Sequence, residues 1–251
     1  MEDKLLFILV YQKIHPLQTM HGLQFGLSQP QTHSWIHRLL PVLRQALAAL
    51  EMAPERDASR VATSPLMLEG APAGALDGTE RRRQRPTDAE KQRAHYRGKK
   101  KAHTDKHVLL INEYTSTVVS LSPTVAGHTH DKKAADEADL TYPVHSTLDK
   151  DTGFQGYEPT GVLTQPPKKP RGQELSVGDK FLNRLIASVR IVVEHVIAGV
   201  KRCRIVKDVF RLTTDGVSDM VMEIACGLHN LRVSCRHPFP PFDVRRLLNS
   251  S

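Results

Sequence analysis

The sequence predicts an α/β domain that follows an all-helical N-terminal region, and three patterns support this fold class. Residues 1–50 are helical in character. Residues 108–111 and 118–121 are short apolar runs on either side of a polar stretch, which predicts a β-hairpin. Residues 181–207 carry apolar side chains at every third or fourth position, which predicts an amphipathic helix. Strands followed by helices are typical of an α/β domain.

The chain has a net charge of +8 over 251 residues, which favours a polyanionic partner. No apolar run is long enough to span a bilayer, so we expect nucleic acid rather than a membrane surface. Apolar residues make up 39% of the chain and aromatic residues 5%, which predicts a modest core. The apolar run at residues 5–10 is too short for a signal peptide and has no cleavage site after it. Three cysteines without framework spacing suit a reducing compartment, so we expect a cytoplasmic protein.

Residues 26–28 have the pattern of the turn in a helix-turn-helix motif. Gly26 can supply a positive φ, Leu27 can fill the core, and Ser28 can cap the next helix. Thr32 departs from the pattern, because many such motifs place an aliphatic side chain there. The candidates for DNA contact on the second helix are Gln29, Gln31, His33, Ser34 and Arg38. An ordinary helical hairpin is the alternative.

A basic segment precedes the predicted hairpin. Residues 80–101 contain ten Lys or Arg against three acids, which indicates phosphate contact more than a solvated face. The candidates for DNA contact in this segment are Arg82, Arg83, Lys99 and Lys100. Residues 51–76 lose periodicity and gain Ala, Pro and Gly, as a linker does. We therefore expect a DNA-binding domain at 1–52, a linker at 53–74, a second domain at 75–236 and a tail at 237–251.

Arg190, Glu194 and Lys201 share one side of the predicted helix, because spacings of four and seven residues are close to one and two turns. A carboxylate at the edge of the buried stripe can point past the core into a cleft. The alternative is a solvated row of ion pairs.

Two clusters of His, Cys and Asp are weaker candidates for metal ligation. His128, His130 and Asp131 form the first, but we expect Asp131 to cap the helix that follows. The second has a zinc-like spacing and consists of Cys226, His229, Cys235 and His237. Residues 218–233, however, have the apolar face of a helix, in which we expect Cys226 to pack as a small hydrophobic side chain.

Three segments resemble the catalytic blocks of the insertion-sequence transposases of the DDE class, and of the insertion-sequence-five family in particular. Arg190-x3-Glu194-x6-Lys201 resembles the signature around the third catalytic carboxylate. Asp77-Gly-Thr-Glu-Arg-Arg-Arg-Gln-Arg-Pro and Asp151-Thr-Gly-Phe-Gln-Gly resemble the blocks that hold the first and second catalytic Asp. Three further blocks are similar to those of the family, at residues 98–104, 130–136 and 165–172.

The resemblance implies an RNase H-like domain, a mixed sheet with flanking helices. In that fold Asp77 ends the first strand, Asp151 lies on the fourth, and Glu194 lies on a helix that crosses beneath them. It implies that the three carboxylates are catalytic and bind two Mg²⁺ (or Mn²⁺) ions, since Mg²⁺ prefers oxygen ligands and two ions can stabilise both oxygens of an in-line phosphoryl transfer. Arg190 and Lys201 then face DNA phosphates or orient Glu194.

The function that the resemblance implies is that of a DNA transposase. A transposase of this kind binds the double-stranded ends of its element as a homo-oligomer, cleaves them, and joins them to target DNA in the bacterial cytoplasm, at the nucleoid. The alternative is an inactive or truncated remnant that only binds DNA. A generic RNA-binding protein is a third class, but the basic segment lacks the interleaved aromatic residues of a base-stacking surface.

The chain departs from the family pattern in two places. The helix at residues 3–11 follows the first methionine almost directly, which indicates a truncated copy or an internal start. Residues 70–76 precede the first catalytic Asp but have few β-branched side chains and contain Pro72. We therefore expect a weak first strand that could misplace Asp77.

Overall fold

The computed structural model describes residues 2–67, 73–164 and 177–236. Its N-terminal region is all-helical, as predicted, and its helices are α1 (Glu2–Ile14), α2 (Gln18–Phe25) and α3 (Gln29–Ala49). Gly26 ends α2 with a φ of 68°, and Ser28 begins α3 with a capping box. Thr32 is fully buried, and its hydroxyl donates to the Ser28 carbonyl oxygen at 2.9 Å. The buried hydroxyl is thus satisfied within the helix, which explains why a polar residue is accepted there.

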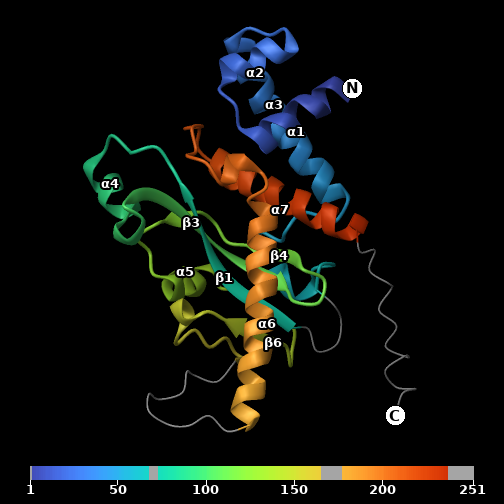
Figure 1. Ribbon diagram of the computed structural model, residues 1–251, viewed down its shortest axis with the longest axis vertical. Helices are drawn as coiled ribbons and strands as arrows, with labels where there is room; N and C mark the ends of the chain where they lie inside the picture. The colour runs from blue at the N-terminus through green and yellow to red at the C-terminus, as the bar shows by residue number, and fades with distance from the viewer. Residues whose placement is uncertain (1, 68–72, 165–176, 237–251) are drawn as a thin grey trace.

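The second region is a mixed β-sheet with helices on both faces (Figure 1). Its longer strands are β1 (Ala73–Arg82), β3 (Ala102–Asn112), β4 (Thr117–Leu121) and β6 (Thr147–Lys150), and its short strands are β2 (Tyr96–Arg97), β5 (Val125–Ala126) and β7 (Leu163–Thr164). β1 pairs with β3 in antiparallel and with β6 in parallel orientation; β4 lies beyond β3 and β7 beyond β6. The α/β class and the predicted hairpin, β3–β4, are confirmed.

The expectation of a weak first strand is wrong, because β1 lies at the centre of the sheet. Its residues form ladders with β3 on one side and with β6 on the other. The small residues have a packing reason: a Cβ added to Gly74 would lie only 3.0 Å from Leu110 Cδ1. Small side chains in β1 thus make room for the large apolar ones of β3. Pro72 lies outside the described residues.

The helices of the second region are α4 (Ala89–His95), α5 (Asp131–Ala138), α6 (Val177–Val200) and α7 (Val217–Arg236). In Figure 1, α6 crosses one face of the sheet, and α7 lies between the sheet and the N-terminal helices. Of the predicted apolar stripe on α6, Val193, Val196 and Val200 are buried, whereas the side chains of 177–188 lie outside the description. The predicted last helix near 218–233 is confirmed as α7. None of the described helices is long and apolar enough to cross a membrane.

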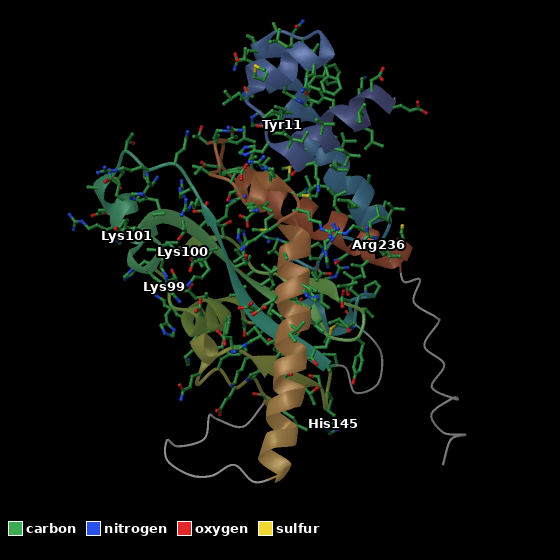
Figure 2. The ribbon with its side chains drawn as sticks, in the orientation of Figure 1. Tyr11, Lys99, Lys100, Lys101, His145 and Arg236 are labelled. Carbon is green, nitrogen blue, oxygen red and sulfur yellow. The ribbon has the colours of Figure 1, made fainter. Side chains whose placement is uncertain are left out.

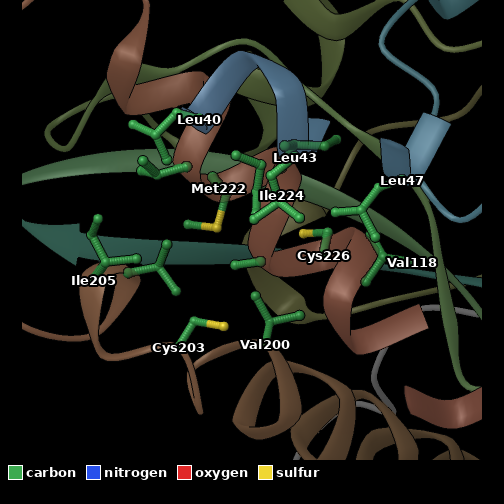
Figure 3. Packing of buried hydrophobic residues seen from close by; sticks show 14 of the residues in the cluster. Leu40, Leu43, Leu47, Val118, Val200, Cys203, Ile205, Met222, Ile224 and Cys226 are labelled. Atoms are coloured by element: carbon green, nitrogen blue, oxygen red, sulfur yellow. The ribbon is translucent and has the colours of Figure 1, made fainter. Parts of the chain in front are cut away.

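One hydrophobic core joins the N-terminal helices to α6, α7 and one face of the sheet. Figure 3 shows its centre, where side chains of α3 face side chains of α7: Leu40, Leu43 and Leu47 opposite Met222, Ile224 and Cys226. A second core lies on the opposite face of the sheet, where Leu76, Val108 and Leu110 pack beneath α5. The division into two domains at residue 52 remains a prediction, because these segments share one core.

Residues 53–67, which belong to the predicted linker, are packed against the sheet. The Glu55 backbone exchanges hydrogen bonds with Val119 and Leu121 of β4, at 2.7 and 3.1 Å. Val61, in a short 3₁₀-helix at Ala58–Thr63, is fully buried. The Ala and Pro residues of this segment therefore belong to an ordered connection that covers one edge of the sheet.

Candidate active site

Asp77 and Asp151 lie side by side at the centre of the sheet. Asp77 is on β1, and Asp151 directly follows β6. The parallel register pairs Ala73 with Thr147 and Ala75 with Asp149, an offset of 74 residues, so Asp77 continues to Asp151. The prediction that the first strand ends at Asp77 is wrong. β1 runs on to Arg82, because its pairing with β3 continues along that length.

Both side chains belong to the face of the sheet that α6 covers. Side chains alternate along a strand, so Asp77 shares a face with Ala75, which lies in the core with α6 and α7. Leu76, between them, belongs to the core beneath α5. The Asp151 carboxylate accepts a hydrogen bond from the Arg190 guanidinium of α6 at 2.6 Å. The two sequence blocks that carry these aspartates thus meet under one helix.

The Asp77 carboxyl group is partly buried, and its surroundings raise its pKa to about 6. Burial is the largest cause, and the negative charges of Asp151 and Asp131 add to it. The Gly78 N–H, which donates to the carboxylate at 2.6 Å, and the positive charge of Lys201 act in the opposite direction. Burial and the neighbouring carboxylates thus disfavour an uncompensated negative charge on Asp77, which favours a bound proton or a metal cation there.

Glu194 lies on α6, exposed, between the two cations predicted to flank it. Arg190 contacts Asp151, and Lys201 is close enough to Asp77 for each to shift the pKa of the other. At about 100° per residue, Glu194 lies within about 40° of both cations around the helix axis. That phase turns Glu194 toward the two aspartates. Within the described part of the chain, however, no three His, Cys, Asp or Glu side chains are close enough to hold a metal ion.

Asp131 and Lys106 also approach the site, from the opposite face of the sheet. Asp131 was only a weak metal-ligand candidate that we expected to cap a helix, and Lys106 was not predicted as a site residue. The helix cap is His130, whose ring nitrogen accepts from the Lys132 N–H at 3.3 Å, so the expectation that Asp131 caps α5 is wrong. Asp131, the first helical residue, instead accepts a hydrogen bond from the buried Lys106 ammonium at 2.7 Å. The one signal in the sequence was a lysine two residues before the apolar run of β3.

The comparison with protein families matches this geometry. The model described as "DDE superfamily endonuclease" matches residues 76–230, which is more than half of the chain and spans all three carboxylates. The chain belongs to the DDE superfamily of endonucleases. A second model, described as the helix-turn-helix of the DDE superfamily endonuclease, matches residues 1–49. The resemblance seen in the sequence blocks and the predicted enzyme class are thereby confirmed.

Two relatives are named as transposases of insertion sequences. One, for the element IS702 of Microchaete diplosiphon, is 25% identical over 211 residues, which cover 84% of this chain and 73% of the relative. The other, for the element IS112 of Streptomyces albus G, is 29% identical over 235 residues, which cover 93% of this chain and 81% of the relative. No solved structure matches the chain.

DDE endonucleases use divalent metal ions, and the two central carboxylates of this member fit such an ion in donor type and placement. Asp77, in the middle of β1, and Asp151, directly after the parallel strand β6, offer hard oxygen ligands side by side. Burial is the main cause of the raised pKa of Asp77, and the negative charges of Asp151 and Asp131 add to it. The third predicted ligand, Glu194, lies on the helix that faces them. The number and identity of the ions stay predictions.

All five candidates on the helix-turn-helix of this endonuclease are exposed, Ser34 only partly: Gln29, Gln31, His33, Ser34 and Arg38. Gln29 donates to Gln18 of α2 at 3.0 Å, and Arg38 lies over the ring of Trp35. Gln31 is different, because its side-chain oxygen accepts from the Ser28 N–H at 2.9 Å and completes the capping box. Its side chain therefore has a structural role at the start of the helix.

The basic segment holds both exposed and structural cations. Figure 2 shows Lys99 and Lys100 together with Lys101 at the loop between α4 and β3, all exposed. Lys100 pairs with Glu80 at 3.0 Å, and Arg82 is exposed. Arg83 is half-buried and forms an ion pair with Asp105 at 2.9 Å. Arg83 and Lys100 thus both form ion pairs within the protein, and Arg83 is the more buried of the two.

The predicted packing role of Cys226 is confirmed, because its side chain is fully buried in the core of α3 and α7. His229 is also buried, and its ring bonds to the Ser116 carbonyl oxygen at 2.9 Å. Cys235 is exposed, and His237 lies outside the described residues.

Proposed function

We propose that this DDE endonuclease is the transposase of an insertion sequence, which binds the ends of its element, cleaves them with a divalent metal ion and joins them to target DNA. The observation that carries the proposal is the pair Asp77 and Asp151, held on adjacent parallel strands beneath the helix that presents Glu194. The names of the two relatives support the choice of transposition among endonuclease activities.

The residues divide the work as follows. The exposed face of α3 reads the element end, and the loop that carries Lys99 and Lys100 holds DNA phosphates. Arg190 and Lys201, on either side of Glu194, donate to phosphate oxygens or keep Glu194 directed toward the aspartates. Asp77 and Asp151 hold the divalent ion, which, when bound, stabilises the charge on the attacking and leaving oxygens of the phosphodiester. The negative charge around Asp77 serves to attract that cation.

Strand transfer needs two ends at one target, so the active form on DNA is a homo-oligomer. Asp77, Asp151 and Glu194 all come from one chain, so each copy would carry a complete set of carboxylates. A second copy would therefore supply the second element end and would complete no half-formed site.

Metal-dependent nicking tests the function. Purified protein is incubated with a labelled duplex that carries a terminal inverted repeat of the element that encodes it, in Mg²⁺, in Mn²⁺ or with a chelator. We expect cleavage at the repeat end with either metal and none with the chelator, and no preferred cut in a shuffled duplex of equal length. Selective binding of the repeat without any cleavage would instead identify a DNA-binding remnant.

A further inference from the structure

We propose that Asp131 and Lys106 form a clamp on the far face of the sheet that fixes the spacing of the segments carrying Asp77 and Asp151. The proposal rests on the proposed function, in which these two aspartates hold the metal ion. Asp131 and Lys106 are then positioning residues, which act through the backbone of the two strands and do not touch the ion themselves.

The first observation is the burial of Lys106. Its side chain is only 1% exposed, and its ammonium donates to Asp131 Oδ1 at 2.7 Å and to the Thr129 carbonyl oxygen at 2.5 Å. Removing a charge from water costs several kcal/mol, and only close, well-directed partners offset that cost. Lys106 therefore ties β3 to the start of α5 at a fixed point.

The second observation is that two glycines make room for the Asp131 carboxylate. A Cβ on Gly78, beside Asp77, would lie 3.2 Å from Asp131 Oδ1. A Cβ on Gly153, two residues after Asp151, would lie 2.5 Å from Asp131 Oδ2. Neither glycine has a positive φ, so space and not backbone conformation accounts for their small size. One carboxylate thus contacts both segments that carry the catalytic aspartates.

The third observation separates the clamp from the metal site. Gly78 follows Asp77, so the side of the strand that it turns to Asp131 is opposite to the side on which Asp77 lies. Asp131 is at the start of α5, whose Ala134 and Ala135 pack in the core on that opposite face. Its Oδ1 already accepts from Lys106. The carboxylate therefore supports the strands from behind, whereas Asp77 and Asp151 face α6.

The main test is Gly153→Ala, which pushes a methyl group against Asp131 and leaves every charge in place. The readout is the Mn²⁺ affinity of the full chain, measured by electron paramagnetic resonance of the free ion. The Asp77→Asn variant, measured separately, gives the Mn²⁺ binding that does not depend on Asp77. We expect Mn²⁺ affinity to fall about tenfold, as it does when a second layer of contacts around a metal site is disturbed, while duplex binding stays within about twofold. Gly98→Ala is the matched control, because a Cβ there meets nothing within 4 Å.

Charge removal separates positioning from ligation. Asp131→Asn alone leaves Lys106 without a carboxylate, so Mn²⁺ affinity should fall; Lys106→Met/Asp131→Asn removes both charges and keeps the side-chain shape between the glycines. If Asp131 is a clamp, the double variant recovers most of the affinity that the single variant loses. No recovery would make Asp131 a ligand and overturn the proposal.

Two further results would also overturn it: a folded Gly153→Ala protein with unchanged Mn²⁺ affinity, or a wild type without Asp77-dependent Mn²⁺ binding. The Gly153→Ala result decides the matter even where the charge variants fail to fold. Failure of the proposed function looks different. In that case the wild type binds Mn²⁺ through Asp77, responds to Gly153→Ala, and yet does not nick the element end.

Discussion

Glu194→Gln is the substitution that tests the site most directly, because the structure separates its effect on stability from its effect on catalysis. Glu194 is exposed on α6, and its role rests on the phase of the helix between Arg190 and Lys201. Glutamine keeps the shape and the helix propensity of glutamate but removes the charge that a divalent cation needs.

The two magnitudes differ widely. An exposed substitution of this kind changes the free energy of unfolding by at most about 0.5 kcal/mol. Loss of one ligand weakens a metal-assisted transition state by several kcal/mol. A loss of about 3–4 kcal/mol corresponds to a rate roughly 10²–10³ times lower, at 1.36 kcal/mol per tenfold. We therefore expect nearly normal stability and duplex binding, with single-turnover cleavage lower by at least two orders of magnitude.

The assay is single-turnover nicking of a labelled element end in saturating Mg²⁺, with thermal unfolding measured in parallel. His195→Gln is the matched control, because His195 is the next residue, is also exposed and points about 100° away around the helix. We expect the control to cleave at the wild-type rate. Equal rates for Glu194→Gln and an active wild type would refute the argument from helix phase and remove Glu194 from the site.

Three further predictions concern DNA binding and stability. Lys99→Gln/Lys100→Gln should lower the slope of log affinity against log salt for duplex binding by about 2, one for each lost phosphate contact; an unchanged slope would exclude this loop from the interface. Asn230 is fully buried; its side chain accepts from the Val118 N–H and donates to the carbonyl oxygens of Val118 and Met52, at 2.8–2.9 Å. Asn230→Ala should therefore lower the free energy of unfolding by about 3 kcal/mol or more, measured by denaturant unfolding. A loss below about 1 kcal/mol would contradict this packing. Burial and the neighbouring Asp149 raise the pKa of Glu113 from its ordinary value of 4.5 to about 7, so the wild type loses stability as the pH rises between these two values. Glu113→Gln, which stays neutral, should raise the melting temperature at pH 8 and leave it unchanged at pH 4. A shift of equal size at both pH values would argue against a raised pKa.

Local patterns predicted the parts of the fold that local physics determines. The turn at Gly26–Ser28 is specified by a positive φ and a capping side chain, and both are present. The phase of α6 follows from the spacing of its apolar residues, of which Val193, Val196 and Val200 are buried. These features need no knowledge of distant segments, so the sequence alone was enough to place them.

The features that the sequence missed depend on contacts between distant segments. β1 looked weak because its alanines and glycines have low strand propensity, yet it is central because β3 and β6 satisfy its backbone on both sides. Asp131 looked like a helix cap, and only the tertiary structure brings it to Lys106 and to the two glycines. The packing of 53–67 on β4 was invisible for the same reason.

The shared core connects α3, the helix predicted to contact DNA bases, to β1, the strand that carries Asp77. α3 is 21 residues long, roughly 30 Å at 1.5 Å per residue. Its first half carries the exposed candidates for DNA contact, whereas Leu40, Leu43 and Leu47 of its second half are buried against α7. α7 in turn is fixed to β4 by Asn230, and β4 to β1 through β3. The helix predicted to read DNA is therefore joined to the strand that carries Asp77 through the packed elements α7, β4 and β3. In the proposed function, this packing sets the distance from the bases that α3 reads to the phosphodiester that is cut.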